Sequence, residues 1–77
     1  MYNDYYIRVG QFFKNKRLSF NMTYENVGEA LNKSKGWYYD VERGKNKIYL
    51  KDAKLLCDLF KCTLSELQEY VDTHPTK

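Results

Sequence analysis

The cationic side chains of this 77-residue chain are unevenly distributed, and this limits the chemistry they can support. Residues 1–50 hold nine Lys and Arg against five Asp and Glu, a net charge of +4. Residues 51–77 hold four cations against five anions, a net charge of −1. Clustered cations suit a polyanion such as a nucleic-acid backbone. The alternative interpretation is that these lysines are ordinary solvated side chains.

Side chains that could support catalysis or hold a metal ion are few. The chain has one histidine, His74, and two cysteines, Cys57 and Cys62. They do not make a four-ligand zinc set, and they supply no nucleophile–base pair. We therefore expect no enzyme activity, metal site, cofactor or small-molecule ligand. We interpret both cysteines as small buried hydrophobic residues, and the alternative is a disulfide or redox pair.

The composition favours a single all-helical domain over residues 1–77. Hydrophobic residues make up 43% of the chain and charged residues 30%, as in folded globular proteins. There is one proline and no alternating, strand-like run. No apolar run approaches the roughly 20 residues that span a bilayer, and the N-terminus lacks a signal-peptide pattern. We expect a cytoplasmic protein without membrane contact, with a frayed tail over about residues 73–77.

Five helices are expected, over about residues 4–20, 24–31, 35–43, 50–60 and 64–72. Asn21 and Asn32 suit the left-handed conformation that closes a helix, and Gly44 suits the same role after the third helix. Gly10 is costly inside the first helix, by about 1 kcal/mol against Ala. We therefore expect another element to pack closely against Gly10.

The segment 23–43 predicts two short helices joined by a tight turn. Thr23 is a good N-cap for the first of them, although Asn26 stands where Glu or Gln would complete a capping box. Ser34 is the predicted N-cap of the second. Helices joined by so short a turn cross at a steep angle, which is the geometry of a helix-turn-helix.

Apolar stripes define the expected core. The third helix is expected to turn Tyr38 and Val41 inward. The stripe of the fourth helix consists of Leu50, Ala53, Leu56, Cys57 and Phe60. The last helix begins with a complete capping box, from Thr63 to Glu66. Its apolar face consists of Leu64, Leu67 and Val71.

This pattern resembles the Cro/lambda-repressor-type helix-turn-helix family, also called the xenobiotic response element (XRE) family, over about residues 9–67. The residues that carry the resemblance are Gly10, Phe13, Arg17, Met22, Thr23, Val27, Gly28, Ser34, Val41, Glu42, Arg43, Gly44 and the run from Thr63 to Leu67. The resemblance implies an all-α, five-helix bundle of the lambda-repressor DNA-binding-domain type. Its second and third helices would form the helix-turn-helix and bind double-stranded DNA.

The resemblance also implies roles for individual positions. Arg17 and Glu42 are expected to form a structural ion pair between the first helix and the end of the third, unless both point to solvent. The positions implied to read base edges in the major groove are Lys35, Gly36, Tyr39 and Asp40. The positions implied to contact the DNA backbone are Thr23, Tyr24, Ser34, Trp37, Arg43, Lys45 and Lys47.

The chain departs from the family pattern in several places. Tyr24 stands where relatives often have Gln, Gly28 where Ala is usual, and Ile48 where the loop often ends in Pro. The recognition helix is unusually aromatic. Lys35 could donate to guanine, and Asp40 could accept from cytosine N4 or only pair with a cation along the helix.

We expect a transcriptional repressor that binds a palindromic operator as a homodimer, because a single helix-turn-helix covers few base pairs. Control of a phage, a plasmid, a mobile element or a restriction–modification system suits so short a chain. Leu55, Leu59, Tyr70 and Val71 are candidates for the dimer interface, unless they only complete the core. The alternative function is a protein-interaction module or antirepressor that binds through its aromatic side chains and has weak or no DNA binding.

Overall fold

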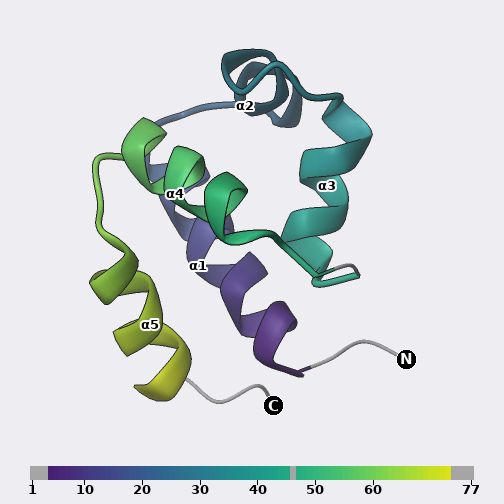
Figure 1. The fold of residues 1–77 in the computed structure, drawn as a ribbon. Coiled ribbons are helices and arrows are strands. Elements are labelled where there is room, and N and C mark those ends of the chain that lie inside the picture. The colour runs from purple at the N-terminus through teal and green to yellow at the C-terminus, as the bar shows by residue number, and fades with distance from the viewer. Residues whose placement is uncertain (1–3, 46, 74–77) are drawn as a thin grey trace.

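The computed structural model describes residues 4–45 and 47–73, which form five α-helices and no strand, as predicted. The helices are α1 (Asp4–Ser19), α2 (Tyr24–Ala30), α3 (Lys35–Arg43), α4 (Leu50–Leu59) and α5 (Leu64–Thr73). α1 packs against α3 on one side and α5 on the other, and α2 packs on α3 (Figure 1). None of the described helices is long and apolar enough to cross a membrane.

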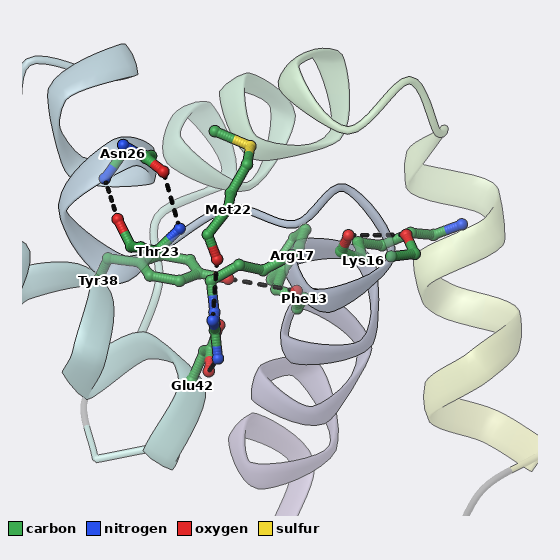
Figure 2. Close-up of polar contacts among 9 residues, drawn as sticks. Phe13, Lys16, Arg17, Met22, Thr23, Asn26, Tyr38 and Glu42 are labelled. Atoms are coloured by element: carbon green, nitrogen blue, oxygen red, sulfur yellow. Dashed lines mark hydrogen bonds and ion pairs between the residues drawn. The ribbon is translucent and has the colours of Figure 1, made fainter.

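Side-chain caps begin α2 and α3. Thr23 Oγ1 accepts a hydrogen bond from the Asn26 amide at 3.0 Å, and Asn26 Oδ1 accepts one from the Thr23 amide at 2.9 Å (Figure 2). The expectation of an incomplete capping box was therefore wrong, because the amide oxygen of Asn26 still reaches the Thr23 N–H. At α3, Ser34 Oγ accepts a hydrogen bond from the Trp37 amide at 3.0 Å, so Ser34 is the predicted N-cap.

Left-handed residues follow several of the helices. Asn21 has φ 57° and Asn32 has φ 59°, which confirms both predictions. Gly44, with φ 70°, ends α3 as predicted. Lys61 has φ 57° after α4, and its residue type had not indicated this conformation. Helices α1, α2 and α4 each end one residue before the predicted boundary, within the usual variation of helix ends.

The core collects the inner faces of all five helices. Its buried members are Val9, Phe12, Phe13, Val27, Tyr38, Val41, Ala53, Leu56, Cys57, Phe60, Cys62, Leu67 and Val71. Leu50 was wrongly placed in the core, because the residue is 70% exposed. It is the first residue of α4, and the space beside it is a cavity rather than a packed neighbour.

The four residues considered for a dimer interface have different environments. Val71 is 3% exposed and fills the core, so it is not available to a second copy, and its choice as an interface residue was wrong. The half-buried Tyr70 packs its ring 5.5 Å from the ring of Phe12. Leu55 is 47% exposed and Leu59 is half-buried. Helix periodicity could not separate these cases, because it shows which residues share a stripe but not which neighbour covers it.

The backbones of α1 and α3 meet at Gly10. A Cβ atom at this position would lie 2.5 Å from the carbonyl oxygen of Val41 and 2.7 Å from the carbonyl carbon of Glu42. The predicted close approach is therefore confirmed. Gly28 has a similar role within the helix-turn-helix, since a Cβ there would lie 2.9 Å from two carbonyl oxygens of the following turn.

The two cysteines, Cys57 and Cys62, are buried and free. Burial raises the pKa of the Cys57 thiol to about 12 and also raises the pKa of Cys62. The thiolate is the reactive form of cysteine, so a buried thiol with a raised pKa is unreactive. Both side chains act as core hydrophobes, in agreement with the first interpretation.

Candidate nucleic-acid interface

An ion pair between Arg17 and Glu42 fixes the end of α3 to α1. The Arg17 guanidinium donates from Nε to Glu42 Oε2 at 2.7 Å and from Nη2 to Oε1 at 3.2 Å. Its Nη1 donates to the carbonyl oxygen of Met22 at 3.0 Å (Figure 2). The Arg17 and Glu42 side chains are only 11% and 4% exposed, so they do not point to solvent. The fork of the guanidinium matches the carboxylate and sets the angle of α3.

Two aromatic rings surround this ion pair. The Tyr24 ring lies against the guanidinium, with Arg17 Cζ 4.3 Å from the ring centroid. The buried Tyr38 hydroxyl donates to the carbonyl oxygen of Phe13 at 3.2 Å, and burial raises its pKa above the ordinary value. The hydrogen bond to Glu42 raises the pKa of Arg17, against the opposing effect of burial. The inner side of α3 is therefore anchored to α1 by both an ion pair and a neutral hydrogen bond.

The outer side of α3 carries the positions expected to read bases. Lys35, Gly36 and Tyr39 are exposed, and Asp40 is half-buried. A Cβ at Gly36 would meet only Ser34 Oγ, at 4.0 Å, so open space surrounds the first turn of α3. Unlike Gly10, Gly36 does not accommodate a neighbouring helix.

Asp40 lies in a group of neighbouring side chains that also includes Tyr24, Tyr39 and Arg43. Arg43 Nη1 lies 3.9 Å from Asp40 Oδ1, and Arg43 Cζ lies 5.2 Å from the centroid of the Tyr39 ring. The rings of Tyr24 and Tyr39 meet edge to face with centroids 5.3 Å apart. Asp40 therefore pairs with a cation along the helix. The pair is weak, because both side chains are partly exposed.

The positions expected to contact the DNA backbone are arranged around α3. Thr23 and Ser34 are exposed, and each hydroxyl oxygen accepts a hydrogen bond from a helix N–H, which leaves its own proton available for donation. Lys45 and Lys47 are exposed in the segment after α3. Trp37 is half-buried beside the core.

A contact between the helix-turn-helix and α4 was not predicted from the sequence. Lys33 Nζ, in the turn, lies 3.8 Å from Asp52 Oδ1 and 5.3 Å from the ring centroid of Trp37. Asp52 is only 3% exposed, in the first turn of α4. An acid in that turn favours a helix start, and this was the available signal. Its partner lies on another element, so no local pattern links the two.

Metal chemistry has no candidate site in the part of the chain that the structure describes. Residues 4–45 and 47–73 contain no group of three or more His, Cys, Asp or Glu that could hold an ion. His74 lies outside the described residues. The outer face of α3 presents hydrogen-bond donors, aromatic rings and cations.

A model of the helix-turn-helix family matches residues 13–67, a range that includes all of α2, α3 and α4. The chain belongs to the Cro/C1-type helix-turn-helix family. The five-helix arrangement is the all-α, lambda-repressor-like fold that the resemblance implied. Family membership supports a DNA-binding regulator, and the family is typically non-enzymatic. A comparison with curated proteins found no match to the chain.

Proposed function

We propose that this regulator is a sequence-specific repressor that binds a palindromic operator as a homodimer. The observation that carries the proposal is the difference between the two sides of α3. Tyr38 and Val41 are buried on its inner side, whereas Lys35 and Tyr39 are exposed on the outer side. A helix anchored on one side and exposed on the other can enter the major groove without losing a core contact.

In this proposal the outer positions of α3 read bases. Lys35 donates to guanine O6 and N7, the acceptors that this base presents in the major groove. Gly36 adds no bulk, so the first turn of α3 can approach the base edges closely. Tyr39 adds an aromatic contact. Asp40 accepts from cytosine N4 only when its weak pair with Arg43 opens.

The surrounding side chains hold the DNA backbone. The hydroxyl protons of Thr23 and Ser34 are available to phosphate oxygens, and the cations of the segment after α3 neutralise phosphate charge. The full set proposed for the backbone is Thr23, Tyr24, Ser34, Trp37, Arg43, Lys45 and Lys47. Each phosphate neutralised by a cation releases counterions, so binding should weaken steeply as salt rises.

Two copies are proposed because one recognition helix contacts only a few base pairs. Two-fold related copies would place their helices about one DNA turn apart, roughly 34 Å, and would match an inverted repeat. The setting proposed for this regulator is the control of a phage, a plasmid, a mobile element or a restriction–modification system.

The main test is selection of bound sequences from random duplex DNA, followed by footprinting of the selected site. We expect an inverted repeat with half-sites about 34 Å apart. Lys35→Ala should weaken specific binding more than non-specific binding. Lys54→Ala is the matched control, because this lysine is exposed on α4, outside the proposed surface. Equal loss on both kinds of DNA would make Lys35 a phosphate contact instead.

Salt titration tests the cationic segment. Lys45→Ala combined with Lys47→Ala should lower affinity for all sequences and reduce the slope of log K against log salt by about 2 for each copy bound. An unchanged slope would remove this segment from the interface. If the wild-type chain bound no DNA even at low salt, the proposal would fail, and the alternative of an interaction module or antirepressor would gain support.

A further inference from the structure

We infer that two copies of this chain pair through the Tyr49–Leu50 corner, which consists of these two residues and the cavity beside them. The inference rests on the homodimer of the proposed function. Tyr49 and Leu50 are 72% and 70% exposed. They are the most exposed large hydrophobic residues among those the structure describes. Neighbouring exposed apolar side chains that form one patch are typical of protein–protein contact sites.

Tyr49 also departs from the way the neighbouring helices begin. It is the N-cap of α4 but makes no side-chain cap hydrogen bond. Thr23, Ser34 and Thr63 cap α2, α3 and α5, each accepting a hydrogen bond from a first-turn amide. An aromatic N-cap leaves these amides of α4 without a side-chain acceptor and weakens the helix start. Residues that break a local rule are typically found at functional or strained positions.

A cavity of about 270 Å³ lies next to this pair, between the starts of α1, α4 and α5. The residues that line it are Tyr5, Tyr6, Val9, Ile48, Leu50, Ala53, Leu64, Leu67 and Gln68. The lining contains no charged residue, so no like charges would meet inside the cavity. An exposed apolar pair beside a largely apolar, uncharged hollow can be self-complementary, as an isologous interface requires. Tyr49 of each copy would enter the hollow of the other.

The position of the corner favours a second copy as its occupant. Tyr49 lies two residues after Lys47, so the corner is close in the chain to the cations proposed for the DNA backbone. Both belong to the segment that joins the end of α3 to the start of α4 (Figure 1). Recognition helices on successive major grooves lie about 34 Å apart. The molecule measures 29 × 27 × 22 Å, so two copies on one side of a duplex lie almost in contact. Pairing at this corner leaves both α3 helices facing the DNA.

The groove at the other end of α4 is less suited to pairing. It is lined by Ala30, Leu31, Asn32, Leu55, Asp58 and Leu59. A two-fold contact there would bring the Asp58 carboxylates of the two copies close together, and like charges at an interface are unfavourable. Leu55 is also less exposed, at 47%, than either residue of the Tyr49–Leu50 corner.

Sedimentation of two variants tests the inference. Leu50→Glu adds a charge to the corner, and Leu55→Glu adds the same charge elsewhere on α4. We expect Leu50→Glu to sediment as a monomer, to retain binding to a single half-site, and to lose cooperative binding to the full operator. Leu55→Glu should remain a dimer. Tyr49→Ser, which restores a capping hydroxyl, should also be monomeric while its helical circular dichroism is unchanged.

Three results would overturn the inference: a dimeric Leu50→Glu variant, loss of the dimer in Leu55→Glu alone, or a wild-type chain that is monomeric both free and on a two-half-site duplex. Failure of the wild-type chain to bind DNA would instead contradict the proposed function. The sedimentation of the free protein would still decide whether the corner pairs.

Discussion

At the junction of α1 with α3, Arg17 and Glu42 are joined at 2.7 Å, and their side chains are 11% and 4% exposed. At the start of α4, Tyr49 and Leu50 are 72% and 70% exposed, and no side chain caps the helix. At the junction the charged groups are paired away from water, whereas at the corner the apolar groups are exposed to water. The two regions therefore respond differently to substitution.

This difference separates stability from association. A buried charge that loses its partner destabilises the fold strongly, so the α1–α3 junction tolerates little change. An exposed apolar side chain makes few contacts within its own chain, so it can change with little loss of stability. The junction holds α3 at a fixed angle, and the corner is available to a partner. Four substitutions test this separation, and their expected effects decrease in the order given.

Arg17→Ala should have the largest effect. It leaves the Glu42 carboxylate without its partner in a site that is 4% exposed. We expect the free energy of unfolding to fall by about 3–5 kcal/mol, measured by urea denaturation. Arg43→Ala is the matched control, because its pair with Asp40 is partly exposed and should contribute less than about 1 kcal/mol. Equal losses would mean that the junction is not distinct from a surface pair.

Gly10→Ala should separate α1 from α3. The added Cβ would lie 2.5 Å from the Val41 carbonyl oxygen, and backbone cannot move aside as a flexible side chain can. We expect a loss of about 1–3 kcal/mol, seen as a lower melting temperature. Gly36→Ala should have the opposite sign, a gain of about 0.5–1 kcal/mol, because its nearest neighbour would be 4.0 Å away. A neutral Gly10→Ala would contradict tight packing at the junction.

Tyr49→Asp should stabilise the isolated chain while removing its pairing surface. An Asp N-cap supplies the missing acceptor to α4, and we expect a gain of about 0.5–2 kcal/mol. Thermal melting in the Leu50→Glu background avoids any contribution from pairing. Tyr49→Ala removes the ring without adding an acceptor, so it should give no gain. A destabilising Tyr49→Asp would show that the tyrosine ring stabilises its own chain.

Tyr38→Phe should change stability and its dependence on pH. At neutral pH the loss of the hydrogen bond to Phe13 should cost about 0.5–1.5 kcal/mol. Burial raises the pKa of Tyr38, so above about pH 10 the unfolded phenol ionises while the folded one stays protonated. The free energy of unfolding therefore falls as pH rises through this range.

Urea denaturation at neutral and alkaline pH checks this prediction. Tyr38→Phe should reduce the alkaline loss relative to the wild-type chain. Cys57, whose pKa is raised to about 12, contributes in the same direction in both proteins. An undiminished alkaline loss in Tyr38→Phe would mean that Tyr38 is not its source.

Much of the fold could be predicted because helix boundaries depend on local signals. Thr23, Ser34 and Gly44 act within a few residues of their own positions, and the structure confirms their roles. Periodicity placed most of the core correctly for the same reason. It failed at Leu50, which is 70% exposed, because being in an apolar stripe does not say which neighbour covers a residue.

The candidate site was only partly predictable. The pairing of Arg17 with Glu42 came from the resemblance to the family, because no local pattern joins residues on different helices. The contact of Lys33 with Asp52 was not predicted at all. Sequence left open whether Asp40 reads a base or pairs along the helix, and the structure places it near Arg43.

The five helices, their main caps and the class of the fold could be predicted from the residues alone, because hydrogen bonds and side chains within about four residues decide where a helix starts and ends. Which apolar residues are covered, and which are left exposed at the start of α4, became clear only from the packed helices. Exposure depends on how separate helices meet, and that depends on contacts such as Gly10 with Glu42, which join distant parts of the chain.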